Sequence, residues 1–205
     1  MQEKFAVIGG DRRLAALAQA LAEDGFAVST YAVEGFAGGD LEAALRGASV
    51  AALPLPSFDA AGDLIAQSGA RVRAADIAAL LTPGMHVFGG KLGAEAAVLA
   101  GSGAAVVDYL SLERLTAANA VPTAEGAIQI AMERLPVTIQ GCRALVIGWG
   151  RIGKILARKL SLLGADVTVS ARREADAAMI GALGMQDEIT GRFCRGLSQY
   201  DLVVN

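Results

Sequence analysis

Short apolar runs alternate with amphipathic segments along the whole chain. The runs that predict buried strands in the first half lie at residues 5–8, 27–31, 50–53, 85–88 and 104–107. Between the first two, from Leu14 to Leu21, apolar residues recur at the spacing of a helix. Continuous apolar strands separated by helices indicate a parallel sheet that is covered on both faces. We therefore predict a flavodoxin- or Rossmann-like α/β domain over residues 1–118.

The same alternation restarts after a connecting segment. Thr123 follows Pro122 and suits the N-cap of a helix that Pro136 ends, so residues 119–137 are expected to link two domains. Further strands are predicted at 144–147, 166–170 and 202–205, and further helices at 152–163 and 175–183. A doubly wound nucleotide-binding fold has about six strands. We therefore expect residues 138–205 to form a second doubly wound, parallel-sheet domain that is truncated at its C-terminus.

Composition narrows the class of protein. The 205 residues are 54% hydrophobic and 19% charged, with a net charge of −3, which excludes a disordered or collagen-like chain. No uncharged stretch reaches the ~20 apolar residues of a membrane span, and no cationic leader opens the chain. Without a basic run, neither nucleic acid nor an anionic membrane is expected as a partner. Cys142 and Cys194 lack metal-ligand spacing, so we expect reduced core residues of a cytoplasmic protein and no metal site.

The clearest chemical motif is GWGRIG at residues 148–153, which matches GxGxxG between a predicted strand and a predicted helix. Gly148 permits a tight turn, Gly150 lets the backbone approach a pyrophosphate, and Gly153 lets the helix pack closely on the strand. The helix N-terminus then favours phosphate. The residues predicted to hold the pyrophosphate are Gly148, Gly150, Arg151, Ile152 and Gly153. The alternative is a glycine-rich packing turn without a ligand.

The residues that follow the next predicted strand favour NADP over NAD. NAD-binding units place Asp or Glu there, about 20 residues after the glycine loop. This chain instead carries Ser170, Ala171, Arg172 and Arg173, and its first carboxylate there is that of Glu174. Because arginine binds phosphate with a bidentate fork, we predict that Ser170, Arg172 and Arg173 hold a 2′-phosphate. The alternative is that both arginines belong to a solvated helix start.

Polar residues after the strands of the first domain are candidates to bind a substrate, because open α/β sheets bind ligands beyond the carboxyl ends of their strands. Asp11 follows the first strand and suits a helix N-cap. The candidates to bind carboxylates are Arg12, Arg13, Lys91 and Thr123, the last with the N–H groups of its predicted helix. A solvated surface role is the alternative for each. His86, the single histidine, lies at the start of a strand, where a structural role is expected.

Several segments resemble the A subunit of bacterial dipicolinate synthase. They are FAVIGGDRR at 5–13, NAVPTAEGAIQIA at 119–131, TIQGCRALVIGWGRIGKILA at 138–157, LGADVTVSAR at 163–172 and DLVVN at 201–205. The GGDxR start and the PTxEG segment discriminate this family, because GxGxxG and LGA occur in many dehydrogenases. The resemblance covers nearly the whole chain, and the family's chains continue beyond the DLVVN strand.

The resemblance implies a sporulation enzyme of a branch of lysine biosynthesis, located in the cytoplasm of the mother cell. It implies oxidation of a dihydro- or hydroxytetrahydro-dipicolinate to pyridine-2,6-dicarboxylate, with NADP as the acceptor. The partner that it implies is the flavoprotein-like B subunit of the same enzyme. Thr123 and Glu125 are then candidates for substrate contact or proton transfer. Glu125 has a second interpretation, as a first-turn partner of the helix dipole.

Two other functions remain open. One is a generic NAD(P)-dependent dehydrogenase of the hydroxyacid or shikimate type, although no Lys–Asp pair of the shikimate kind is evident in the first domain. The other is a non-catalytic, nucleotide-binding partner of the B subunit. An exposed edge of an incomplete sheet would favour a homo-oligomer.

Overall fold

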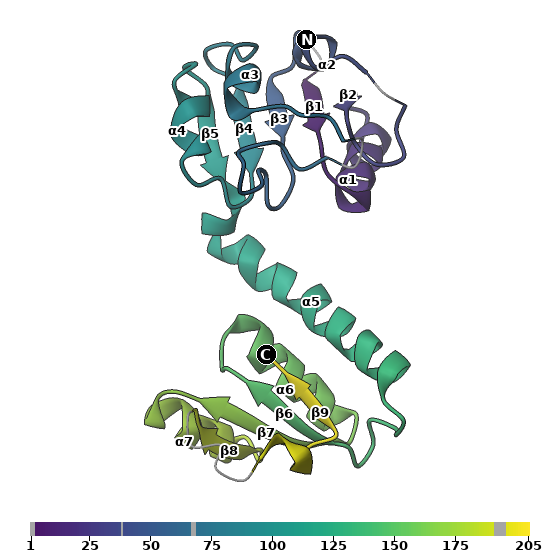
Figure 1. Ribbon diagram of the computed structural model, residues 1–205, viewed down its shortest axis with the longest axis vertical. Helices are drawn as coiled ribbons and strands as arrows, with labels where there is room; N and C mark the ends of the chain where they lie inside the picture. The colour runs from purple at the N-terminus through teal and green to yellow at the C-terminus, as the bar shows by residue number, and fades with distance from the viewer. Residues whose placement is uncertain (1–2, 38, 67–68, 191–195) are drawn as a thin grey trace. The chain divides into compact units, whose positions relative to one another are not determined.

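The computed structural model describes residues 3–37, 39–66, 69–190 and 196–205. It divides into two compact units, residues 1–113 and 114–205. Each unit is built on a parallel sheet with helices packed against it (Figure 1). The prediction of two parallel-sheet α/β units is therefore confirmed.

The first unit contains a five-stranded sheet in the order β2-β1-β3-β4-β5. Its strands are β1 (Lys4–Ile8), β2 (Ala27–Tyr31), β3 (Val50–Ala52), β4 (His86–Gly89) and β5 (Ala105–Asp108). Its helices are α1 (Arg12–Glu23), α2 (Leu41–Leu45), α3 (Ala74–Ala78), α4 (Glu95–Ala100) and the short η1 (Tyr109–Ser111). This is the flavodoxin-like order, in which the winding reverses between β1 and β3.

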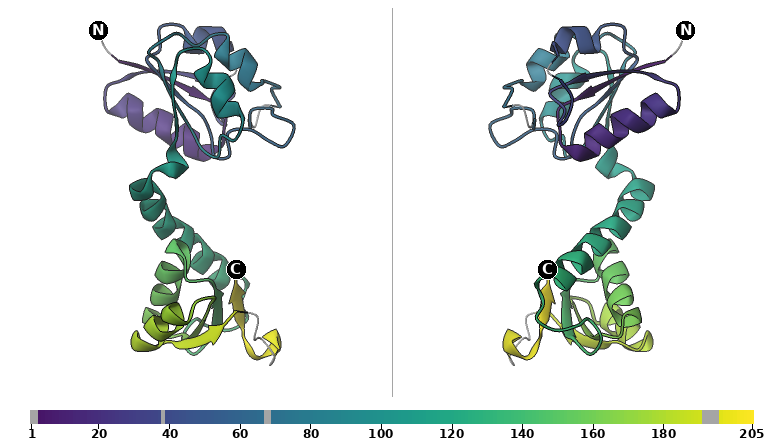
Figure 2. Two further views of the ribbon diagram at one scale, coloured as in Figure 1. Left: turned by 90° about the vertical axis from the view of Figure 1, so that its left-hand side faces the viewer. Right: turned by 90° about the vertical axis from the view of Figure 1, so that its right-hand side faces the viewer.

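Alternate residues of β1 show how the first sheet is covered. Ala6 and Ile8 pack with side chains of α2, α3 and α4 in one apolar cluster. Val7 packs on the other face with Leu14 and Ala18 of α1. Figure 2 shows α1 on one side of this sheet and the other helices opposite it. Both faces are buried, which explains why the strands read as continuous apolar runs.

The second unit contains a four-stranded sheet in the order β8-β7-β6-β9. Its strands are β6 (Arg143–Ile147), β7 (Asp166–Ala171), β8 (Gln186–Ile189) and β9 (Leu202–Val204). Its helices are α5 (Glu113–Arg134), which begins at the boundary of the units, α6 (Arg151–Leu162), α7 (Glu174–Ala182) and the short η2 (Leu197–Gln199). In chain order this sheet reads 3-2-1-4, which corresponds to the first four positions of the Rossmann order.

The core of the second unit lies between β6, β7 and three helices. Ala144 and Val146 of β6 pack with Leu156 and Leu160 of α6 in one buried cluster, which Ile128 of α5 also joins. The C-terminal half of α5 is therefore part of this unit and not a free linker.

The predicted start of the connecting helix at Thr123 is wrong. Helix α5 begins at Glu113 and continues through Pro122. The Thr123 hydroxyl does not cap a helix; it donates to the Asn119 carbonyl, 2.8 Å away, one turn earlier. Proline is best tolerated in a first turn, but the alanine-rich residues 117–120 have high helix propensity and extend the helix on its N-terminal side.

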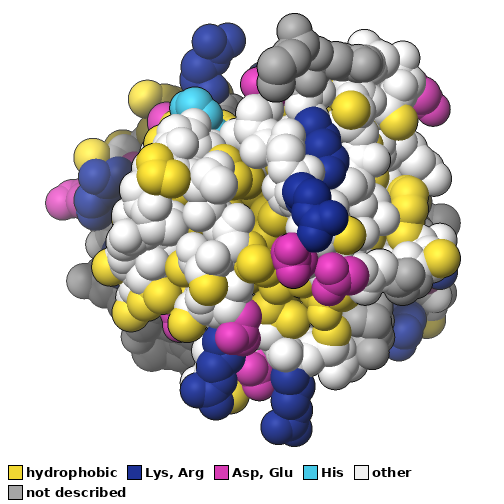
Figure 3. Space-filling model, turned by 90° about the horizontal axis from the view of Figure 1, so that it is seen from above, with side chains coloured by type: hydrophobic (Ala, Val, Ile, Leu, Met, Phe, Trp, Pro, Cys, Tyr) yellow, Lys and Arg dark blue, Asp and Glu magenta, His cyan; other side chains and the backbone are white. Residues whose placement is uncertain are grey.

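Of the predicted core cysteines, the structure describes one, and the single histidine lies at the start of a strand, as expected. Cys142 is buried and free, and burial raises the pKa of its thiol. Cys194 lies outside the described residues. His86 stands at the first position of β4 and is exposed; the face that carries the histidine is seen in Figure 3.

None of the described helices is both long enough and apolar enough to cross a membrane. Within the same described ranges, no group of His, Cys, Asp and Glu side chains is arranged to hold a metal ion.

Candidate functional site

The glycine loop joins the end of β6 to the start of α6. Gly148 has a φ of +108°, in the left-handed region that favours glycine. Its N–H donates to the Ser170 carbonyl at 2.8 Å, which ties the loop to β7. A Cβ at Gly153 would collide with the Gly148 carbonyl oxygen. The backbone therefore requires glycine at both positions, whether or not a ligand binds.

Packing does not require glycine at position 150. Gly150 has a φ of −81° and a ψ of −170°, and a Cβ built on it would meet no heavy atom within 4 Å. It is the N-cap of α6, and no side chain caps the helix there. Open space before an uncapped helix N-terminus is what a pyrophosphate needs. The loop therefore fits a dinucleotide, and the predicted contacts of Arg151 and Ile152, in the first turn, remain predictions.

Ser170 does not lie where a 2′-phosphate contact requires it. Its side chain is fully buried in β7, and its hydroxyl oxygen lies 2.7 Å from that of Thr190. The strand position directs this hydroxyl into the unit, so it does not reach the surface. Motif spacing predicts the place of Ser170 along the strand but not the face of the sheet on which it lies.

The two arginines after β7 differ in their contacts. Arg173 donates Nε and Nη2 to the Asp176 carboxylate at 2.7 and 2.9 Å, and this bond lowers the pKa of Asp176. Arg172 is exposed and forms no hydrogen bond or ion pair with any residue that the structure describes. Buried Ala171 ends β7, at the place where NAD-binding units carry a carboxylate. Arg172 is therefore the more accessible guanidinium for a phosphate.

A second site lies in the first unit, where the winding reverses between β1 and β3. A cavity of about 230 Å³ opens there. Its lining residues follow β1, follow β3 or belong to a later loop, and they are Gly10, Asp11, Arg13, Pro54, Leu55, Ile65, Ala66 and Gly69. Doubly wound sheets bind ligands at this reversal.

Asp11 caps α1, as its position predicts. Its Oδ1 accepts from the Arg13 backbone N–H at 3.0 Å, and both carboxylate oxygens accept from Arg13 Nε at 3.0 and 3.1 Å. Arg13 Nη2 also donates to the Leu55 carbonyl at 3.0 Å. The bond from the Arg13 side chain lowers the pKa of Asp11, and the same bond raises the pKa of Arg13. The loop after β1 is thereby joined to the loop after β3.

Arg12 and Lys91 do not line this cavity. Arg12 Nε lies 3.2 Å from Glu34 Oε1, and the Arg12 side chain is 90% exposed. Lys91 is also exposed, and its backbone N–H donates to Asp108 Oδ1 at 3.2 Å. Their predicted contacts with substrate carboxylates remain predictions.

Thr123 and Glu125 lie inside α5. Because this helix begins at Glu113, Thr123 offers no uncapped N–H groups, and the first-turn dipole interpretation of Glu125 is wrong. Glu125 Oε1 instead lies 2.8 Å from Lys159 Nζ, which links α5 to α6. A part for either residue in substrate contact or proton transfer remains a prediction.

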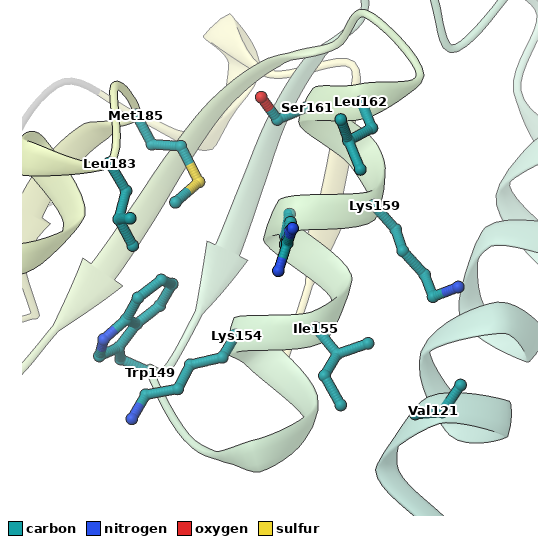
Figure 4. A pocket seen from close by; sticks show the side chains of 10 residues that line it. Val121, Trp149, Lys154, Ile155, Lys159, Ser161, Leu162, Leu183 and Met185 are labelled. Atoms are coloured by element: carbon teal, nitrogen blue, oxygen red, sulfur yellow. The ribbon is translucent and has the colours of Figure 1, made fainter.

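A larger cavity, of about 910 Å³, lies over α6 and was not predicted. Figure 4 shows Trp149, Leu183 and Met185 gathered on one side of α6 and Val121 of α5 on the other. Lys154 Nζ lies 5.8 Å from the centroid of the Trp149 ring. Trp149, between the first two glycines of the motif, was the only sequence feature that could have indicated this cavity. The GxGxxG pattern allows any residue at that position, so the motif gives Trp149 no expected role.

Comparisons with known proteins identify relatives of this chain. A model of the N-terminal domain of the dipicolinate synthase A subunit matches residues 4–110. The corresponding protein of Bacillus subtilis (strain 168), the A subunit of dipicolinate synthase, is 36% identical over 87 residues, which is 42% of this chain and 29% of that protein. The aligned region thus spans less than a third of that relative.

Two solved structures share the fold. The dipicolinate synthase A chain from Bacillus subtilis superposes with a TM-score of 0.77 at 24% identity, over 100% of this chain and 72% of that one. A transhydrogenase from Sinorhizobium meliloti has a TM-score of 0.61 at 17% identity, over 90% of this chain and 54% of that chain. The fold of this chain, with its two parallel-sheet units, therefore also occurs in other proteins.

Proposed function

Because this chain belongs to the family of dipicolinate synthase A subunits, we propose that it takes part in the NADP-dependent formation of pyridine-2,6-dicarboxylate. The substrate would be a dihydro- or hydroxytetrahydro-dipicolinate. A dihydro ring loses one hydride and one proton to become aromatic, and a hydroxytetrahydro ring loses water as well. Aromatisation favours the reaction, so the protein has mainly to position the ring and bind its carboxylates.

The open space at Gly150 is the single observation that carries the proposal. The left-handed backbone explains glycine at position 148 and packing explains it at 153, whereas neither explains the absence of a side chain at Gly150. A nicotinamide dinucleotide, when bound, supplies the hydride acceptor. The residues that would hold its pyrophosphate are Gly148, Gly150, Arg151, Ile152 and Gly153, and the α6 dipole would offset its negative charge.

A preference for NADP over NAD is supported by the end of β7. Ala171 presents no carboxylate to repel a 2′-phosphate, and the exposed guanidinium of Arg172 follows it. Arg173 would contribute only if its bond to Asp176 were shared or broken. We assign the buried Ser170 hydroxyl no contact with the nucleotide.

The relative from Bacillus subtilis is named as one subunit of an enzyme, which supports a different subunit of that enzyme as the partner of this chain. We propose that this partner is the B subunit of dipicolinate synthase, and that the complex works in the cytoplasm of the mother cell during sporulation.

Nucleotide-dependent stabilisation tests the proposal. NADPH is expected to raise the thermal unfolding temperature of the chain more than NADH does, because only NADPH carries the 2′-phosphate that Arg172 can bind. Gly150→Val should abolish the effect of both nucleotides, since its side chain fills the pyrophosphate space. The measurement is differential scanning fluorimetry with each nucleotide.

Gly126→Val is the matched control, because a Cβ at Gly126 in α5 also meets no heavy atom within 4 Å. It should keep the response of the wild type. Equal protection by the two nucleotides would remove the argument from Arg172, and full protection of Gly150→Val would remove the loop from the site.

A further inference from the structure

The cavity between the ends of β1 and β3 is built by backbone contacts. A Cβ at Gly9 would lie 2.8 Å from the Ile65 carbonyl oxygen. That oxygen accepts from the Gly10 N–H at 2.8 Å. The two glycines therefore let a later loop segment approach the end of β1 and form one wall of the cavity. At about 230 Å³ the cavity is smaller than the roughly 300–1,000 Å³ of a site that encloses a whole drug-sized ligand, so it fits one end of a small molecule.

Arg13 supplies the positive charge of this cavity, and Asp11 supplies a negative one. Its Nε and Nη2 are engaged by Asp11 and by the Leu55 carbonyl, whereas its Nη1 forms no hydrogen bond to the residues that the structure describes. The side chain is 63% exposed, so a ligand can reach it from solvent. A guanidinium with unused N–H groups at the rim of a cavity is a binding group for a carboxylate or a phosphate.

Two contacts hold this guanidinium in one orientation. The Asp11 carboxylate binds its Nε side, and the Leu55 carbonyl binds Nη2 at 3.0 Å. Because the rotamer is already fixed, less side-chain entropy is lost when a ligand binds. The carboxylate oxygens of Asp11 already accept hydrogen bonds from the backbone N–H and the side chain of Arg13. The negative charge of Asp11 is offset by its ion pair with Arg13, in which Oδ2 lies 3.0 Å from Nη2. The Nη1 edge of Arg13 is therefore the part that is left to bind an anion.

We propose that Arg13 binds one carboxylate of a small dicarboxylic acid in the cavity between β1 and β3. The class of ligand rests on the proposed function; the site rests on the geometry. Arg13 is preferred over Arg12 because Arg13 lines the cavity and Arg12 does not. A dicarboxylate leaves its second carboxyl group outside this small cavity.

Calorimetric titration of the 205-residue chain with pyridine-2,6-dicarboxylate tests the proposal. Loss of a charge-assisted hydrogen bond should weaken binding of this probe by roughly tenfold or more in Arg13→Gln. Arg13→Lys keeps the charge without the planar fork and should lie between Arg13→Gln and the wild type. Arg46→Gln is the matched control: Arg46 is an exposed arginine of the same unit, ion-paired with Glu42 at 2.7 Å, and should bind as the wild type does.

The same samples are titrated with NADPH, which reports on the other unit. Unchanged NADPH affinity in Arg13→Gln, together with weakened probe binding, supports the proposal. Wild-type affinity of Arg13→Gln for the probe would overturn it, and so would a wild-type chain that does not bind the probe. Failure of the wild type to bind any nicotinamide nucleotide would instead contradict the proposed function and leave the probe result standing.

Amide NMR of the wild-type chain provides a test that needs no variant. The probe should shift the signals of Gly10 and Leu55, which line the cavity, and leave those of α6 in place. Unmoved signals at Gly10 and Leu55 at a saturating probe concentration would overturn the proposal.

Discussion

The residues at the end of β7 show which details of a candidate site the sequence predicts and which it does not. The sequence locates the end of β7 and the arginines after it, because the strand is a continuous apolar run and the motif spacing is fixed. It does not show that the Ser170 hydroxyl points inward to Thr190. Successive side chains of a strand point to opposite faces of the sheet, so an error of one residue in the expected register exchanges the two faces. It also does not show whether Asp176 engages Arg173. Contacts of this kind depend on rotamers and not on spacing.

Arg172→Asp should weaken NADPH binding by roughly tenfold or more and NADH binding by much less. The variant removes a guanidinium from the proposed 2′-phosphate position and adds a repelling carboxylate. The measurement is a fluorescence titration with each nucleotide. Arg158→Asp, which makes the same charge change at an exposed position of α6, is the control and should affect both nucleotides alike. Parallel loss of both affinities in Arg172→Asp would assign this residue a role other than phosphate recognition.

At the scale of single elements, α5 and β8 depart most from the sequence-based expectation. A proline followed by a threonine favours the start of a helix. The residues on both sides of Pro122 have high helix propensity, however, and α5 continues through the proline. Strand β8 was missed because its first residues, Gln186, Asp187 and Glu188, are polar. Its parallel pairing with β7 comes from contacts between distant segments, which local periodicity does not encode.

Gly153→Ala should destabilise the chain by about 1–3 kcal/mol, a typical cost of overpacking a tight contact. The added methyl group would collide with the Gly148 carbonyl, which is backbone and cannot rotate away. Urea denaturation measures the change. Gly126→Ala, where α5 leaves open space, should instead stabilise the chain by about 0.5–1 kcal/mol. A Gly153→Ala variant as stable as the wild type would show that α6 can shift away from the loop.

For the molecule as a whole, the sequence predicts two α/β units but not the strand orders. Each order depends on which distant strands pair, and the apolar pattern of a buried parallel strand is the same wherever it lies in the sheet. The two reversal points, one between β1 and β3 and one between β6 and β9, therefore emerge only from the structure. They explain why the glycine loop and the Arg13 cavity occupy equivalent places in two different sheets.

The single tryptophan of the chain makes the two units separable in experiment. Trp149 lies in the second unit, so its fluorescence follows the unfolding of that unit alone. At about 100 times its Kd, NADPH should raise the midpoint of this transition by roughly 10–20 °C. Calorimetry should show a separate transition of the first unit that NADPH leaves in place. A single calorimetric peak that moves as a whole would show that the units unfold cooperatively.

The polar composition of β8 has a consequence for association. This strand forms one border of its sheet, and a border strand exposes a row of main-chain groups that invites pairing with a foreign strand. Two adjacent carboxylates, Asp187 and Glu188, lie along that row. A second copy approaching border to border would bring like charges together. The polar residues that make β8 hard to predict from the sequence therefore also disfavour edge-to-edge pairing of this sheet with a second copy.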